Sequence, residues 1–244
     1  MMLCLDAGNT WLKYGLHDGQ VWRMRQAVDY AAVDQLAATL SAPLERPTRI
    51  IACNVAGLAV RRQIEQIAAR LAVPLAWLES SAACCGVRNT YDQPAQLGAD
   101  RWAALIAAHA LHAEPVVVVL AGTATTIDLL DGDGVFRGGL ILPGLTMMRQ
   151  ALARNTAGLP EASGQFRERP TNTDDAIISG AVQATLGAIE RMRVELAPGA
   201  RCIVSGGAAA ELLPYLVAPV RQIDHLVLEG LRCVAEAGID SRAG

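Results

Sequence analysis

The sequence has few aromatic residues, no block of like charges and no long apolar run, and the last two shortages each disfavour a class of protein. Aromatic residues make up 4% of the chain and charged residues 18%, with a formal net charge of −3. That balance gives no electrostatic reason to expect a nucleic-acid partner. No apolar stretch reaches the roughly 18 residues that a membrane span needs, so we expect no membrane partner.

Targeting signals and cysteine motifs are also scarce. The chain enters a predicted strand directly, without the basic region, apolar segment and cleavage site of a signal peptide. Its six cysteines form no C-x-x-C pair, which disfavours a zinc or disulfide framework and favours free thiols in a reducing compartment. We therefore expect a cytoplasmic protein.

Small and branched apolar residues are plentiful. Hydrophobic residues make up 52% of the 244 residues, which is enough to bury the cores of two ordinary domains and argues against disorder.

The order of apolar runs and turns occurs twice along the chain. An apolar run, a small-residue loop, a second run, a turn and a third run begin at residue 2, and the same order begins again at residue 116. Apolar runs separated by Gly-rich turns predict strands, and Asp-Gly between two of them predicts a hairpin. The duplication predicts two similar halves that meet near residues 114–115.

Helical and strand patterns alternate after each repeat, which predicts an α/β fold. The predicted helices are residues 30–40, 58–71, 97–113, 174–196 and 226–237, and the further strands are residues 49–53, 75–78 and 201–205.

The loop of each repeat is suited to holding phosphate. Gly8 and Gly122 let the backbone turn and approach a ligand, and successive N–H groups with the hydroxyls of Thr10 and Thr123 can surround phosphate oxygens. A single such loop is more often a plain hairpin turn. Two copies at matching positions favour a ligand site, because a turn that only reverses the chain need not repeat its chemistry.

Charged side chains accompany the first loop. Asp6, at the strand end, could hold a hydrated Mg²⁺, which needs only one or two carboxylates. Lys13 could add positive charge near a phosphate, or could lie exposed on the hairpin. A third glycine element, at residues 205–208, is suited to an adenine ring.

Residues 91–101 run from a turn into a predicted helix. Gly98 permits close backbone approach, and Asp100 and Arg101 lie in the first turns of the helix. Asp100 could simply favour the helix N-terminus, where a carboxylate gains about 0.3–1 kcal/mol. With Tyr91, however, the pair could offer a hydroxyl acceptor and a carboxylate clamp to a small acidic alcohol.

These motifs together resemble those of the type III pantothenate kinase family, which includes proteins called Bvg accessory factors and belongs to the actin-like ATPase superfamily. The matching motifs occur in family order: D-x-G-N-T at residues 6–10, Y-x-x-P-x-x-L-G-x-D-R at 91–101, G-T-A-T-T at 122–126, G-G-x-I-x-P-G at 138–144, N-T at 172–173, S-G-G at 205–207 and L-V-L-E-G-L at 226–231.

The resemblance implies a duplicated actin-like (ribonuclease H-like) α/β fold, with two similar halves and a cleft between them. The first half, residues 1–114, would carry the first phosphate loop and the substrate motif. The second, residues 115–244, would carry the second phosphate loop and the adenosine element. The implied activity is phosphorylation of pantothenate by ATP to 4′-phosphopantothenate, the first step of coenzyme A synthesis, by a homodimer that uses Mg²⁺ and K⁺ or NH₄⁺.

The resemblance also assigns roles to individual residues. Asp100 is implied to be the proton acceptor. The residues implied to contact ATP are Asp6, Ala7, Gly8, Asn9, Thr10, Trp11, Leu12, Lys13 and Thr123, and those implied to contact pantothenate are Tyr91, Gly98, Ala99, Asp100, Arg101 and Thr173.

One position departs from the family pattern. The family usually has an Asp three residues before the Thr of G-T-A, where it helps to bind the monovalent cation, but this chain has Leu120. The internal repeat also aligns Leu120 with Asp6, so a monovalent-cation site is in doubt.

Two other functions compete with pantothenate phosphorylation. One is a kinase of the same superfamily that acts on a sugar or acetate, which the motif at residues 91–101 disfavours. The other is a nucleotide-binding accessory or regulatory protein without kinase activity, which the presence of Asp6, Asp100, Arg101 and Thr123 disfavours.

Overall fold

The computed structural model describes residues 1–40, 46–159 and 161–238. Its contacts divide the chain into two compact units, one made of Met1–His112 with His225–Gly244 and the other of Ala113–Asp224. The chain passes from the first unit to the second between His112 and Ala113, close to the boundary expected at residues 114–115. The last helix, α7 (Leu226–Glu236), belongs to the first unit, whereas the sequence division put it in the second half. The amphipathic pattern of a helix shows that one face is buried but not which sheet covers that face.

The first unit is built on a five-stranded sheet with the order β3-β2-β1-β4-β5. Strands β1 and β2 and strands β2 and β3 pair antiparallel, as the predicted hairpins require, and β4 and β5 add parallel to β1. The strand bounds are Met2–Ala7 for β1, Leu12–His17 for β2, Trp22–Val28 for β3, Arg49–Asn54 for β4 and Leu75–Trp77 for β5.

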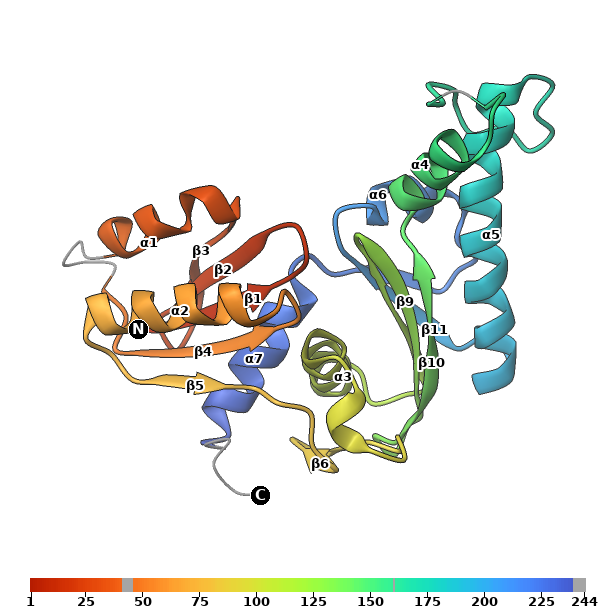
Figure 1. The fold of residues 1–244 in the computed structure, drawn as a ribbon. Helices are drawn as coiled ribbons and strands as arrows, with labels where there is room; N and C mark the ends of the chain where they lie inside the picture. Colours follow the sequence, from red (N-terminus) through yellow and green to blue (C-terminus); the bar gives the residue numbers. More distant parts are fainter. Residues whose placement is uncertain (41–45, 160, 239–244) are drawn as a thin grey trace. The chain divides into compact units, whose positions relative to one another are not determined.

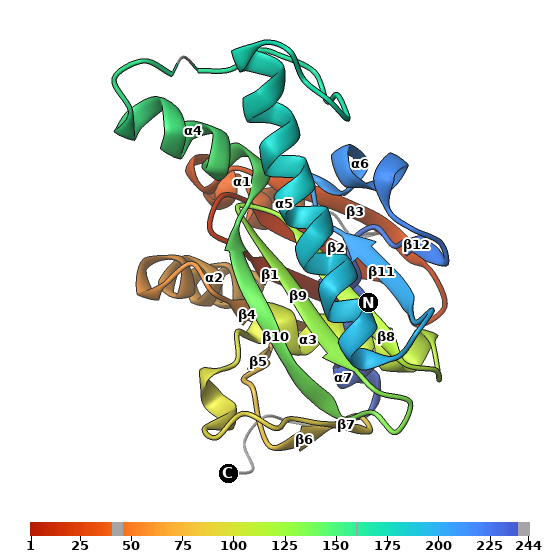
Figure 2. The same cartoon turned by 90° about the vertical axis from the view of Figure 1, so that its right-hand side faces the viewer.

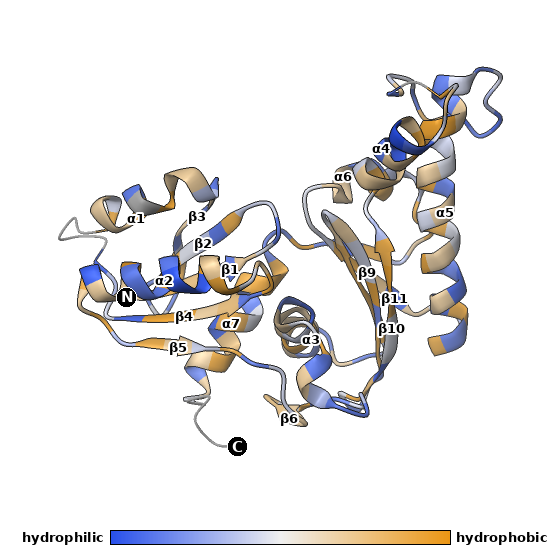
Figure 3. Ribbon diagram, viewed as in Figure 1, coloured by the Kyte–Doolittle hydropathy of each residue, from blue (hydrophilic) through white to orange (hydrophobic). Residues whose placement is uncertain are grey.

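The two faces of this sheet bury different helices. Leu3 and Leu5 of β1 share a core cluster with residues of α1 (Val33–Thr39) and α2 (Leu58–Leu71), which lie on one side of the sheet, whereas α7 lies on the other (Figure 1). The buried residues of α2 follow helical spacing and most of its other positions are hydrophilic, while β4 and β5 are mostly hydrophobic (Figure 3). Because side chains alternate along a strand, Cys4 and Asp6 face away from that cluster.

The second unit repeats the first sheet strand for strand. Its order is β10-β9-β8-β11-β12, again with two antiparallel pairings followed by two parallel ones. The bounds are Val116–Ala121 for β8, Ala124–Leu130 for β9, Phe136–Pro143 for β10, Arg201–Ser205 for β11 and Val220–Gln222 for β12. The expected duplication of an α/β unit is confirmed.

The long helix α5 (Thr173–Leu196) covers one face of the second sheet (Figure 2). Val117 and Val119 of β8 share a core cluster with Val182 and Ile189 of α5. Helix α4 (Leu145–Asn155) packs beside α5. Neither the short helix α6 (Ala209–Leu212) nor the edge strand β12 is predicted from the sequence.

Helix α3 (Ala99–Leu111) of the first unit is preceded by a small hairpin, β6 (Ala83–Cys84) and β7 (Val87–Arg88), and by a 3₁₀ turn at Pro94–Gln96. The observed helix is therefore shorter at both ends than the helix predicted at residues 97–113. Across the described residues, no helix is both long and apolar enough to span a membrane.

Candidate active site

Asp6 lies at the end of β1 with a polar group on each side. In the antiparallel register it pairs with Lys13 of β2, and in the parallel register with Cys53 of β4. The Lys13 Nζ atom is 3.9 Å from Asp6 Oδ2, and the Cys53 thiol donates to Asp6 Oδ1 at 3.7 Å. The sheet therefore holds the carboxylate from both neighbouring strands.

Burial sets the charge state of this carboxyl group. Burial raises the pKa of Asp6 to about 6, Lys13 and the Cys53 thiol oppose the rise, and the charge of Asp100 adds to it. Asp6 and Asp100 are thus electrostatic neighbours, although 93 positions separate them in the sequence. The first phosphate loop and the substrate motif therefore lie near one another within the first unit.

Asp100 occupies the first turn of α3. Its Oδ1 atom accepts a hydrogen bond from the backbone N–H of Arg101 at 2.8 Å. Burial raises the pKa of Asp100, while Arg101 and Lys13 lower it. A Cβ atom on Gly98 would lie 2.7 Å from Asp100 Oδ1, so the motif needs glycine there to leave room for the carboxylate.

Arg101 and Tyr91 form the second part of the substrate motif. Arg101 is buried, its Nη1 atom donates to the Tyr91 hydroxyl at 3.0 Å, and its guanidinium lies 5.7 Å from the centre of the Tyr91 ring. The turn before the helix is held by Asn89, which accepts from the Tyr91 N–H and donates to the Pro94 carbonyl. The tertiary structure therefore brings the predicted substrate residues Tyr91 and Arg101 into contact.

The first loop has buried side chains at its two ends and exposed residues between them. The side chains of Ala7 and Leu12 are fully buried in the core cluster, so only their main-chain groups face the loop. Asn9, Thr10 and Trp11 are exposed. The loop is closed by a hydrogen bond from the Gly8 N–H to the Trp11 carbonyl, at 3.2 Å.

Two other glycine motifs converge on the second loop, within the second unit. The Gly144 N–H donates to the Thr123 carbonyl at 2.9 Å, and a Cβ atom on Gly144 would overlap the Gly122 carbonyl. Gly206, at φ +103°, leaves no room for a side chain against Ala121. Glycine at these two positions lets the segments after β10 and β11 pack directly on the backbone of the loop.

The second sheet places an apolar side chain where the first has Asp6. Leu120 pairs with Thr126 of β9 and Ser205 of β11, as Asp6 pairs with Lys13 and Cys53. The Thr126 hydroxyl oxygen is buried and has no hydrogen-bond partner among the described residues. Polar groups thus flank this position, but the Leu120 side chain supplies no oxygen ligand, and the site does not fit a monovalent cation held by a carboxylate.

Thr173 lies at the beginning of α5. The preceding Asn172 caps the helix, its side-chain oxygen accepting from the Asp175 N–H at 2.9 Å, which explains the Asn of the N-T motif. Thr173 is exposed and lines a cavity of about 790 Å³ between α4 and α5, whose wall is mostly apolar and includes Pro143, Met148, Leu152 and Ile177.

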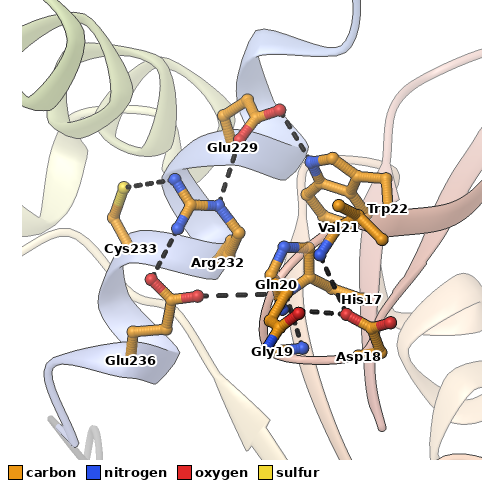
Figure 4. A network of polar contacts seen from close by, with 10 residues as sticks. All are labelled: His17, Asp18, Gly19, Gln20, Val21, Trp22, Glu229, Arg232, Cys233 and Glu236. Atoms are coloured by element: carbon orange, nitrogen blue, oxygen red, sulfur yellow. Dashed lines mark hydrogen bonds and ion pairs between the residues drawn. The ribbon is translucent and has the colours of Figure 1, made fainter.

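Helix α7 holds α3 in place through the L-V-L-E-G-L motif. Gly230 lies directly against the backbone of Ala103. Ala103 is three positions after Asp100 in α3. Glu229 accepts from Trp22 Nε1 of β3 at 2.7 Å and from Arg232 Nε at 3.1 Å, and Arg232 also contacts Glu236 (Figure 4). The motif is therefore explained by packing and anchoring of the helix that supports α3.

Sequence reasoning missed two residues of this site. Cys53 contacts Asp6, and the Tyr30 hydroxyl donates to the Gly8 carbonyl. Cys53 could have been found from the strand order, because it lies near the end of the parallel strand next to β1. Tyr30 lies outside every motif, and no sequence signal points to it.

The Asp6 carboxylate can serve as the protein ligand of a hydrated Mg²⁺ that also binds phosphate oxygens, because Mg²⁺ keeps several waters and needs only one or two carboxylates. Among the described residues, no three His, Cys, Asp or Glu side chains are grouped to hold a metal ion by themselves. Asp6 is the residue that would contact such an ion, with Lys13 next to the phosphates.

Comparison of the fold with solved structures gives full-length matches at low identity. A protein from Campylobacter jejuni described as a Baf family transcriptional activator superposes with a TM-score of 0.66 at 21% identity, covering 97% of this chain and 98% of its own. A 2-dehydro-3-deoxygalactonokinase protein from Sinorhizobium meliloti superposes with a TM-score of 0.63 at 17% identity, covering 97% and 99%. At these identities the matches show the fold alone.

Comparison of the sequence is more specific. The family model described as type III pantothenate kinase matches residues 2–195. Type III pantothenate kinase from Aromatoleum aromaticum is 49% identical over 238 residues, covering 96% of this chain and 98% of the relative. The Dechloromonas aromatica protein of the same name is 44% identical, covering 96% and 99%. The chain therefore belongs to the type III pantothenate kinase family.

Proposed function

We propose that this protein transfers the γ-phosphoryl group of ATP to the primary hydroxyl of pantothenate, forming 4′-phosphopantothenate and ADP in the first step of coenzyme A synthesis. The observation that carries the proposal is the grouping of Asp100, Arg101 and Tyr91 at the start of α3, with Asp6 and Lys13 as electrostatic neighbours of Asp100, in a chain of this family.

Asp100 is the proton acceptor in this proposal. The hydroxyl oxygen of pantothenate forms a bond to the γ-phosphorus, the bond from that phosphorus to the bridging oxygen of ADP breaks, and the hydroxyl proton passes to the Asp100 carboxylate. Phosphoryl transfer depends mainly on positioning and charge neutralisation. Asp100 therefore needs only to orient the hydroxyl and to take the proton late, and its raised pKa favours holding that proton.

Arg101 and Tyr91 would bind the carboxylate of pantothenate. A guanidinium group forms strong paired hydrogen bonds to a carboxylate, and the contact with Tyr91 holds Arg101 in one orientation. Gly98 and Ala99 would line the same subsite through the backbone. Thr173, from the N-terminus of α5, is proposed to contact pantothenate as well.

ATP would be held by the backbone N–H groups of the loop at residues 8–11 and by Thr123 of the second loop. Lys13 would place its ammonium group beside the phosphates, next to Asp6. Bound Mg²⁺ would neutralise charge on the phosphates, with Asp6 as its protein contact. The proposal does not include K⁺ or NH₄⁺, because the Leu120 side chain has no oxygen to bind either ion.

We further propose a cytoplasmic homodimer. Support for the second subunit comes from the apolar cavity between α4 and α5 and from exposed apolar side chains on the same unit, among them Ile141, Met147 and Leu152. Large exposed apolar patches commonly mark protein interfaces. A cytoplasmic location fits the supply of ATP there and the free thiols of the six cysteines.

A coupled assay of ADP release tests the proposed activity. The purified protein is given ATP and Mg²⁺ with pantothenate, and in parallel with a panel of sugars and acetate. We expect turnover with pantothenate alone. Turnover with a sugar or acetate instead would indicate a different kinase of the superfamily, and nucleotide binding without turnover on any acceptor would indicate an accessory protein.

A further inference from the structure

Tyr30 binds the first phosphate loop at both of its ends. Its hydroxyl donates to the Gly8 carbonyl at 2.5 Å, and the same oxygen lies 3.4 Å from the Trp11 carbonyl. The Gly8 N–H donates to that Trp11 carbonyl. One phenol thus ties together the first and last residues of the loop at residues 8–11.

The bond to Gly8 orients the next N–H group of the loop. The peptide unit that joins Gly8 to Asn9 is planar, and in a trans unit its C=O and N–H point in opposite directions. Since the Gly8 carbonyl points at Tyr30, the Asn9 N–H points away from Tyr30. Glycine has wide conformational freedom, so without the phenol this unit could rotate and turn its carbonyl oxygen, rather than its N–H, toward a phosphate.

Tyr30 is itself well supported. It begins the 3₁₀ turn Tyr30–Ala32, which Asp29 caps by accepting from the Ala31 N–H at 2.8 Å, and its ring packs against the core cluster of the first unit. Burial raises the pKa of the Tyr30 hydroxyl, and nearby Asp6 and Cys53 raise it further. The hydroxyl therefore stays protonated and available as a donor.

We propose that Tyr30 is a positioning residue of the nucleotide site, which holds the Gly8 carbonyl so that the Asn9 N–H is available to phosphate oxygens of ATP. The proposal rests on the proposed kinase function. It places a phosphate-site determinant outside every motif that carries the family resemblance, on the segment between β3 and α1.

Tyr30→Phe removes the one oxygen atom concerned, and Tyr14→Phe is a matched control. Tyr14 lies in the same unit and its hydroxyl also makes a strong hydrogen bond, to Gln26 Oε1 at 2.6 Å. For both variants we would measure ATP and ADP affinity by calorimetry without pantothenate, the KM for ATP, the KM for pantothenate, the inhibition constant of adenosine and the melting temperature.

We expect Tyr30→Phe to weaken ATP and ADP binding and to raise the KM for ATP by about 3- to 10-fold, the usual effect of losing one hydrogen bond. The KM for pantothenate and the inhibition constant of adenosine should stay within twofold, because neither ligand uses the loop N–H groups. Tyr14→Phe should leave all of these ligand constants unchanged. If Tyr30 were merely structural, Tyr30→Phe would lower the melting temperature without a selective loss of affinity for phosphate-bearing ligands.

The inference would be overturned if the ATP and ADP affinities of Tyr30→Phe stayed within twofold of the wild type. It would also be overturned if the affinity for adenosine fell as much as the affinity for ATP. If Tyr30→Phe fails to fold, Asp29→Ala, which removes the cap of the same turn, is the second variant. It should lose less affinity for ATP and ADP, and its affinity for adenosine should again be unchanged. Unchanged ATP affinity in Asp29→Ala would then count against the inference. A wild-type protein that binds ATP but phosphorylates no acceptor contradicts the proposed function and leaves the Tyr30 comparison intact.

Discussion

Gly230 of α7 lies against the backbone carbonyl of Ala103 in α3, with no space for a side chain between the two helices. Ala103 follows Asp100 by less than one helical turn, so this contact between the two helices lies close to the proposed proton acceptor. Small changes at Gly230 should therefore affect both stability and catalysis.

Gly230→Ala is expected to lower the free energy of unfolding by about 1–3 kcal/mol or more, because the added methyl group forces the two backbones apart. Denaturant unfolding measures the loss. Gly187→Ala is the control, since Gly187 lies in α5 and a Cβ atom added there would meet no other atom within 4 Å. It should keep or raise the stability, by up to about 1 kcal/mol. Equal stabilities for the two variants would contradict the packing argument.

Asp100→Asn should preserve the fold and pantothenate binding but lower turnover by about 10²- to 10⁴-fold, because an amide cannot accept the hydroxyl proton. Circular dichroism and steady-state kinetics measure the two effects. Asp92→Asn, at an exposed position of the same segment, is the matched control and should be fully active. Near wild-type turnover in folded Asp100→Asn would remove Asp100 from the mechanism.

Asp6 should make the ligand-free protein less stable as pH rises. Its pKa is raised to about 6 from an ordinary 3.8, so between these values the folded state binds more protons than the unfolded state and stability falls with increasing pH. Asp6→Asn should therefore be more stable than the wild type above pH 6, by roughly 2–3 kcal/mol, with little difference below pH 4.

Melting curves of the ligand-free proteins from pH 2 to 8 measure this difference. Asp18→Asn is a control of opposite sign, because backbone hydrogen bonds from Val21 and Gln20 lower the pKa of Asp18 to about 2. Its carboxylate stabilises the fold above pH 4, and that stabilisation is lost as pH falls toward 2. A pH-independent difference between Asp6→Asn and the wild type would show that Asp6 is not buried as a charge.

Leu120 should weaken the response to monovalent cations. We expect activity in sodium or Tris buffer to be an appreciable fraction of that in K⁺. Leu120→Asp adds a carboxylate between Thr126 and Ser205, so it should increase the K⁺ response and melt lower in Na⁺ than in K⁺, because an unpaired buried carboxylate is costly. A wild-type enzyme that is inactive without K⁺ and binds it tightly would require ligands other than residue 120.

The proposed homodimer should sediment at twice the 25.8 kDa mass of the chain at micromolar concentration. Leu152→Glu, in the apolar wall between α4 and α5, should weaken the dimer by burying a charge at its interface. Val194→Glu, at an exposed position of α5 outside that cavity, should not. A single species of 25.8 kDa in the wild type would exclude the dimer.

Much of the fold was accessible to sequence reasoning because its signals are local. Alternating apolar runs and Asp-Gly turns predict the hairpins β2–β3 and β9–β10, and the repetition of that order predicts the two matching sheets, which the structure confirms. The position of α7 in the first unit was not accessible, since amphipathicity shows only that a face is buried. The short elements β6, β7, β12 and α6 carry too few residues for a periodic signal.

The candidate reactive groups can be read from the amino-acid order alone: Asp6, Asp100, Arg101 and the two glycine loops are recognisable because their chemistry requires those residue types at those spacings. Which of these groups contact one another depends on the three-dimensional fold. The parallel register of β4 puts Cys53 against Asp6, the docking of the 3₁₀ turn puts Tyr30 against Gly8, and the packing of α7 puts Gly230 against Ala103. These contacts join residues far apart in the chain, and they depend on strand order and helix docking, which no local pattern encodes.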